Sequence, residues 1–187
     1  MSAVTQLLTP LSFLRIRHPL KRQFDVVIPA VLAAIGTGMF WVLPTEIKIF
    51  GDQGLLSAIT GLIQILTGFY IASLAAVATF QHPTLDSPIA GSPAMLRERI
   101  KGVVKDVSLS RRRFLSLLFG YLAFMGLVLY FVGALANLLA DNVKLFLPDT
   151  AHAWAKWGFV LIYQLAVANL LVTTLLGLHY MADRIHR

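Results

Sequence analysis

The chain has 187 residues, of which 57% are hydrophobic and 13% charged, and its formal net charge is +7. Soluble domains usually carry about 25% charged residues, so this composition argues against an ordinary water-soluble fold. The sequence contains no cysteine. That excludes a disulfide framework, a catalytic thiolate and cysteine-based metal sites.

Four long apolar stretches follow one another along the chain, at about 24–43, 55–80, 114–140 and 157–181. The hydrocarbon core of a bilayer is about 30 Å thick and needs about 20 mostly apolar residues to cross it as a helix. All four stretches qualify. We therefore predict an all-α polytopic membrane protein, with residues 24–187 forming a four-helix transmembrane bundle. The short connection Pro44–Gly54 predicts that spans one and two are antiparallel neighbours.

Residues 1–23 precede the first span and carry apolar side chains without a clean helical stripe. Pro10 and Pro19 interrupt any continuous helix. We predict a juxtamembrane arm here. It either lies on the inner leaflet or forms a poorly ordered tail.

The second span has the clearest residue pattern of the four. One narrow face of the predicted helix carries small or polar residues, namely Ser57, Gly61, Gln64, Gly68, Ala72, Ala75 and Thr79. Membrane helices associate through such faces because lipid gives them no hydrophobic drive to pack. We therefore predict that this face packs against protein, as plain helix packing or as an oligomer seam. A sharper alternative has Gln64 lining a polar pathway or a symmetric oligomer axis.

The loop at residues 81–113 is basic and follows the second span. Within residues 93–107, four apolar residues at helical spacing predict a short amphipathic helix, weakened at Gly102. It either lies on the membrane surface or offers its apolar face to a partner. The candidate residues for binding a partner protein or lipid headgroups are Arg97, Arg99, Lys101, Lys105, Arg111, Arg112 and Arg113.

Spans three and four also carry small and polar residues on one face. Gly126, Gly133 and Asn137 lie in span three, and Asn169 and Thr173 in span four. Interhelical hydrogen bonds of buried amides are worth about 0.6–2 kcal/mol. Such bonds hold together either the helices of one chain or several copies of the chain. Four short helices enclose little volume, so we expect a homo-oligomer, with a tetramer as a guess.

The distribution of the basic residues predicts how the chain sits in the membrane. All 16 Lys and Arg residues except Lys48, Lys144 and Lys156 lie in the N-terminal arm, the 81–113 loop or the C-terminus. With four spans these regions share one side. The positive-inside bias then places both termini and the loop in the cytoplasm, and the net charge gives no reason to expect direct nucleic acid binding.

No catalytic chemistry is visible in the sequence. The centres of the spans lack Asp, Glu, Lys and Arg, so no buried-charge constellation is expected. The five histidines show no metal-ligand spacing, and no phosphate-cradling loop or nucleophile elbow is present. We therefore expect neither enzymatic activity nor a cofactor or metal.

Two functions remain open at this point. The first is a homo-oligomeric membrane sensor or scaffold that docks a soluble cytoplasmic partner on the basic loop. The second is a small pore or holin-like channel lined by Gln64, Thr67, Asn137, Asn169 and Thr173. A small carrier ranks below both.

The four spans and the basic loop Gln81–Arg113 give the chain a plan that resembles the membrane subunit of the two-component Kiwa anti-phage defence system. The resemblance covers the whole chain in outline and implies a bacterial inner-membrane protein that oligomerises. It further implies that the protein senses phage-induced membrane disturbance and recruits a soluble DNA-binding partner, with the basic loop as the docking surface.

Overall fold

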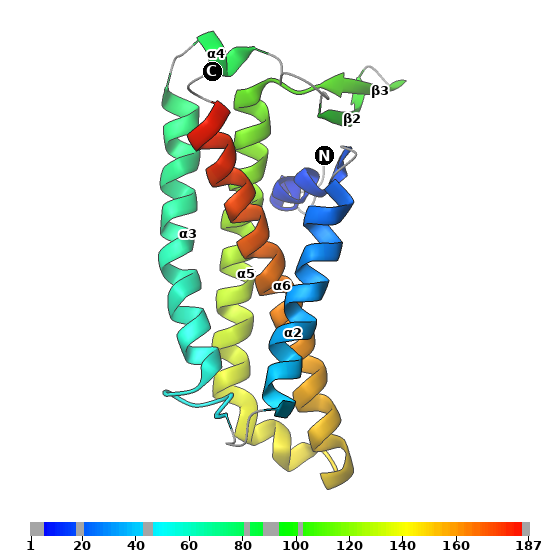
Figure 1. Cartoon of the computed structure of the whole chain (residues 1–187), viewed down its shortest axis with the longest axis vertical. Helices are drawn as coiled ribbons and strands as arrows, with labels where there is room; N and C mark the ends of the chain where they lie inside the picture. The colour runs from blue at the N-terminus through cyan, green and yellow to red at the C-terminus, as the bar shows by residue number, and fades with distance from the viewer. Residues whose placement is uncertain are drawn as a thin grey trace.

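The computed structural model describes residues 6–17, 21–42, 47–80, 83–87, 94–100 and 103–184 (Figure 1). Four long helices dominate it, namely α2 (Ile28–Val42), α3 (Leu55–Thr79), α5 (Arg111–Phe146) and α6 (Asp149–Arg184). A five-residue π-helical turn, η2 (Gln23–Val27), leads into α2. Each of the four predicted spans coincides with a helix long and apolar enough to cross a membrane. The prediction of an all-α polytopic membrane protein is thereby confirmed.

The helices pair in an order that differs from their order in the chain. α3 packs along α5, α5 packs on α6, and α2 packs along α6 (Figure 1). The prediction that spans one and two are neighbours is therefore wrong. The 12 residues between Val42 and Leu55 can reach about 40 Å, which exceeds three interhelical spacings of about 9 Å. The connection is therefore long enough that it does not force α2 and α3 to be neighbours.

Small residues decide where the helices approach closely. A side chain at Gly126 or Gly133 of α5 would overlap Thr67 or Thr60 of α3, so both glycines permit the α3–α5 contact. On the other side, Thr37 of α2 donates a 2.8 Å hydrogen bond to the Gln164 side chain of α6. Packing through small residues and side-chain hydrogen bonds is the usual way in which helices associate inside a membrane.

The helices meet a small sheet at one end of the molecule, here called the sheet end (Figure 1). Its strands are β1 (Ile16–Arg17), β2 (Met95–Ile100) and β3 (Val103–Ser108), antiparallel and in the order β1-β2-β3. A four-residue helix, α4 (Pro83–Asp86), lies between α3 and the sheet in the chain. The opposite end, where α5 turns into α6 at Leu147 and Pro148, is called the corner end.

The sheet overturns the prediction of an amphipathic helix over 93–107. Leu96 is buried while its neighbour Arg97 is exposed, which is the two-residue alternation of a strand. Three valines at 103, 104 and 107 favour a strand over a helix. The register pairs Leu96 with Val107 and Ile100 with Val103, so the apolar spacing interpreted as helical also satisfies a hairpin.

The described part of the N-terminal arm is folded, which contradicts a poorly ordered tail, whereas its place on the inner leaflet stays a prediction. Its described part forms a 3₁₀ helix, η1 (Thr9–Arg15), followed directly by β1. Phe13 and Ile16 are buried, and η1 packs on α5. The described part of the arm is therefore part of the fold through Phe13 and Ile16, while Leu7, Leu8 and Leu14 remain exposed.

Candidate functional site

The predicted seam on α3 faces outward from the chain. Gly61, Gln64, Gly68, Ala72 and Ala75 are exposed, and Ser57 is half-buried. The buried face of α3 is a different one, made of Leu56, Ile63, Thr67, Tyr70, Ser73 and Val77. The interpretation of the seam as packing within one chain is therefore wrong. Its interpretation as a contact with another copy stays a prediction.

Gln64 lies in the middle of this outward face. Its side chain is exposed and has no hydrogen-bond partner among the described residues. Gly61 and Gly68, one turn to either side, have open space where a side chain would stand. An amide in hydrocarbon seeks a partner, and the neighbouring glycines would let a second helix backbone come close to it. We call Ser57, Gly61, Gln64, Gly68, Ala72 and Ala75 the outward α3 face.

The small and polar residues predicted on spans three and four are used inside the chain. Gly126 and Gly133 admit α3, as described above. Thr173 is 2% exposed. Asn137 accepts a 2.6 Å hydrogen bond from the backbone N–H of Gly51 at the corner end, and Asn169 belongs to a polar ring at the sheet side. These residues tie one chain together and are not gathered along a common channel.

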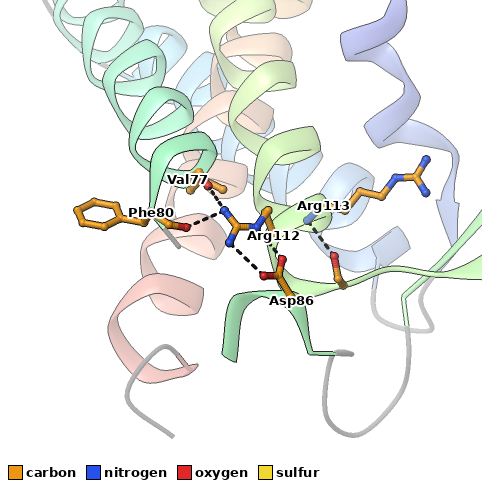
Figure 2. Close-up of polar contacts among 6 residues, drawn as sticks. Val77, Phe80, Asp86, Arg112 and Arg113 are labelled. Carbon is orange, nitrogen blue, oxygen red and sulfur yellow. Dashed lines mark hydrogen bonds and ion pairs between the residues drawn. The ribbon is translucent and has the colours of Figure 1, made fainter. Parts of the chain in front are cut away.

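Arg112 has a structural role that the sequence analysis did not anticipate (Figure 2). Its guanidinium donates to the backbone carbonyls of Val77 at 2.9 Å and Phe80 at 2.7 Å, and to the Asp86 carboxylate at 2.7 Å. It thereby satisfies carbonyls at the C-terminus of α3 that lack helical partners and holds α4 in place. The Arg112 guanidinium lowers the pKa of Asp86 from its ordinary value of 3.8.

The two arginines beside Arg112 are placed differently. The Ser110 hydroxyl accepts a hydrogen bond from the Arg113 backbone N–H and caps the start of α5. The exposed Arg113 side chain extends away from Arg112 and Asp86 (Figure 2). Arg111 is half-buried. Of the three predicted ligand-binding arginines, Arg113 is therefore the one that reaches outward from the sheet end.

The remaining basic candidates belong to the β2–β3 hairpin. Arg97 and Lys105 are exposed, and the register sets Arg97 opposite Asp106 and Lys105 opposite Glu98. Cross-strand pairs of opposite charge stabilise a sheet, and the register places Asp106 across from Arg97. Arg99 pairs with Val104 in the register, and Lys101 lies outside the described residues.

A ring of polar and aromatic contacts joins η1, η2, α5 and α6, and we call it the arm ring. Phe13 stacks on Tyr121 with 5.1 Å between ring centroids, and the Lys21 ammonium lies 4.4 Å from the Phe13 centroid. Lys21 forms an ion pair with Asp25. Asn169 donates to the Asp25 carbonyl at 2.9 Å and accepts from the Tyr121 hydroxyl at 2.7 Å.

The arm ring contains a partly buried ion pair at the start of the first span, outside the span centres that the sequence analysis found free of charge. The side chains of Lys21 and Asp25 are 13% and 17% exposed. Tyr121 lies eight residues past Arg113, about 12 Å further along α5. The i,i+4 spacing of Lys21 and Asp25 signals the ion pair, but the partners from α5 and α6 are visible only in the folded chain.

Comparisons with protein-family models, with curated proteins and with solved structures give no match. Among the described residues there is also no group of three metal-ligating side chains. The features of the structure that bear on its function are the outward α3 face, the sheet end and the arm ring.

Proposed function

We propose that this chain is a homo-oligomeric membrane scaffold and sensor that assembles through the outward α3 face and docks a soluble partner at its sheet end. The setting that the Kiwa resemblance implies is the bacterial inner membrane, with anti-phage defence as the task. The single observation that carries the assembly is Gln64, an amide that has no hydrogen-bond partner in the described part of its own chain and is flanked by glycines with open space beside them.

The energetics favour a second copy of the chain over lipid beside this face. Gly61 and Gly68 allow backbones to approach closely, and the van der Waals contact so gained drives helix association in lipid. In a two-fold contact each copy presents the same residues to the other, so an axis that passes close to Gln64 brings the two amides together. Each amide has both donors and an acceptor, and the pair can satisfy itself.

The sheet end is the proposed docking surface, and the charge distribution supports its cytoplasmic orientation. Arg97, Lys105 and Arg113 are exposed there, whereas the corner end carries Lys48, Lys144 and Lys156, and Lys144 is paired with Asp141. The positive-inside bias puts the sheet end in the cytoplasm. β3 ends the sheet and has no further strand beside it among the described residues, so a partner can reach both its backbone edge and the basic side chains.

The assembly is tested by Gly68→Leu, with Gly38→Leu and Gly158→Leu as matched controls. All three glycines have open space around them in the single chain, so all three variants should fold and insert. A leucine in a close helix contact costs about 1–3 kcal/mol, and a two-fold contact doubles it. We expect the dissociation constant of the Gly68→Leu oligomer to rise at least about 25-fold, with the controls unchanged.

The measurement is cross-linking in native membranes together with mass determination in detergent. Unchanged oligomers in Gly68→Leu would exclude the outward α3 face as the interface. A monomeric wild-type chain in both measurements would exclude the proposed assembly itself.

Partner docking is tested with the full chain in nanodiscs as bait. Charge reversal at exposed Arg97 and Lys105 should abolish capture of a soluble cytoplasmic partner protein, and reversal of Lys144 and Lys156 at the corner end should not. Equal capture by both double variants would refute docking at the sheet end.

The pore alternative finds little support in the geometry. Of its five proposed lining residues, Thr67 and Thr173 are buried within the chain, and Asn137 and Asn169 are hydrogen-bonded within it. Gln64 alone among these five faces outward. We expect liposomes containing the assembled protein to retain their dye, and rapid leakage would favour the pore over the scaffold.

A further inference from the structure

The corner end holds an apolar groove between the ends of α5 and α6, with a volume of about 620 Å³. Its walls are mostly alanine, leucine, valine and aromatic side chains, and Lys144, Lys156 and His152 are the polar residues among them. The groove lies at the opposite end of the helices from the sheet.

The groove is a consequence of how α5 and α6 are joined. The chain passes from one helix to the other within Leu147 and Pro148. His152 on α6 places its Nε2 atom 2.9 Å from the carbonyl oxygens of Lys144 and Leu147 and so fixes the corner. The facing helices carry alanines at 136, 140, 153 and 155, which are too small to fill the space between them.

The depth of the groove matches the boundary between hydrocarbon and headgroups. The sequence places the outer ends of spans three and four at Ala140 and Trp157, and both residues line the groove. Leu135 and Leu139 lie on the hydrocarbon side of that boundary, whereas Lys144 and Lys156 lie beyond it. A molecule lying along the groove would therefore pass from an apolar environment into one with two positive charges.

The charged residues that line the groove, as far as the structure describes it, are both lysines. Lys156 lies with its ammonium 5.5 Å from the Trp157 ring centroid. Lys144 donates to Asp141 at 2.8 Å on the helix surface and remains 63% exposed. A lysine with an apolar stem and an exposed head is suited to a headgroup phosphate at the interface.

The volume is suited to an acyl chain and too small for a helix. At about 30 Å³ for a water-sized group, the groove has room for about 20 such groups, and a methylene is of similar size. One turn of a helix 10 Å wide fills about 400 Å³. The groove would therefore hold less than two turns of a partner helix.

We propose that this groove binds an anionic phospholipid, with one acyl chain between α5 and α6 and the phosphate at Lys144 and Lys156. The bound lipid fills the space that the alanines leave open. It also brings negative charge to the end of the molecule that the positive-inside bias places outside the cytoplasm.

The test follows tryptophan quenching by brominated phospholipid in the full-length protein. Trp41→Phe and Trp154→Phe leave Trp157, which lines the groove, as the sole tryptophan. The protein is reconstituted in phosphatidylcholine vesicles that contain brominated phosphatidylglycerol or brominated phosphatidylcholine at equal mole fraction. We expect phosphatidylglycerol to be preferred, by about fivefold for each lysine.

Two pairs of matched variants test the two halves of the site. Lys156→Gln should lower the preference about fivefold, whereas Lys48→Gln at the same end should not. Ala140→Phe fills the groove and should reduce quenching by both lipids, whereas Ala34→Phe on the lipid-facing side of α2 should not. Inorganic phosphate added to the vesicles should not compete, because the acyl chain is part of the ligand.

Three results would overturn the proposal. The first is equal quenching by the two brominated lipids, and the second is quenching that Ala140→Phe leaves unchanged. The third is a change of oligomer mass in Ala140→Phe without a change in quenching, which would make the groove a contact between copies. Failure of these tests leaves the Gly68→Leu experiment unaffected, since it concerns another helix and another surface.

Discussion

Replacement of Phe13 tests whether the N-terminal arm is held in the fold by the arm ring. Phe13 is 2% exposed and stacks on Tyr121, and it also contacts Phe114 with 6.2 Å between centroids. The Lys21 ammonium lies over its face. Phe13→Ala removes all three contacts and leaves a cavity beside α5.

The size of the effect follows from the contacts that are lost. A buried Phe→Ala change costs about 3–5 kcal/mol. Phe13→Leu keeps most of the apolar volume and loses the ring contacts, worth about 0.5–1.5 kcal/mol for stacking and about 0.5–1 kcal/mol for the cation–π contact. Because η1 and β1 are short, this loss should appear as local opening of the arm before the spans unfold.

Hydrogen exchange of residues 9–17, measured by mass spectrometry in nanodiscs, is the assay. At 1.4 kcal/mol per factor of ten, exchange should be at least about 100-fold faster in Phe13→Ala and about tenfold faster in Phe13→Leu. Leu14, the next residue, is 48% exposed. Leu14→Ala is therefore the matched control and should change exchange about twofold at most.

Exchange within twofold of the wild type in Phe13→Ala would refute the reasoning, because the arm would then be held by contacts other than this ring. Equal acceleration in Phe13→Ala and Leu14→Ala would also count against it. It would show that the segment opens independently of the buried ring.

Three further predictions concern the fold. Gly126→Leu should prevent α3 from packing on α5 and lower the melting temperature in detergent by several degrees, since the added side chain would overlap Thr67; a melting temperature equal to that of the wild type would contradict the α3–α5 contact. Arg112→Lys should speed exchange at the C-terminus of α3, because one ammonium cannot reach two carbonyls and a carboxylate as the guanidinium does; exchange at wild-type rates would argue that water caps α3 equally well. Because the pKa of Asp86 is lowered, its contribution to stability is present above pH 3.8 and is lost as the pH falls below that value. The hydrogen-exchange rate of residues 83–87, corrected for intrinsic rates, should therefore be constant from pH 5 to 8. A transition within that range would contradict the ion pair of Asp86 with Arg112.

Much of the helical part of the structure could be predicted from hydropathy alone. The spans at 55–80 and 114–140 coincide with α3 and most of α5, because a long apolar run in lipid must satisfy its backbone within the segment. Residues 93–107 were predicted wrongly because the spacing of Leu96, Ile100, Val103 and Val107 fits a helix and a hairpin alike. The segment forms strands because β2 pairs with β3 and with β1 from the distant N-terminal arm.

The candidate site was also predictable from the sequence only in part. The pattern on span two predicted that the face with Gln64 packs against protein, but the face of α3 that is buried within the chain is the one with Ile63, Thr67 and Tyr70. Glycines on α5 determine this choice, since Gly126 and Gly133 admit the threonines of α3. A helix pattern taken by itself does not tell which of two faces has a complementary surface elsewhere in the chain.

The sequence by itself determined the surrounding solvent and the number of crossings, because the transfer of an apolar run into lipid depends on composition and length. The tertiary structure alone decided which helices touch and that Arg112 caps α3. It also decided the arm ring, which is formed by Phe13, Lys21, Asp25, Tyr121 and Asn169. The physical reason is that packing and hydrogen bonding depend on the shapes and directions of groups far apart in the chain. Those relations do not exist until the helices have docked.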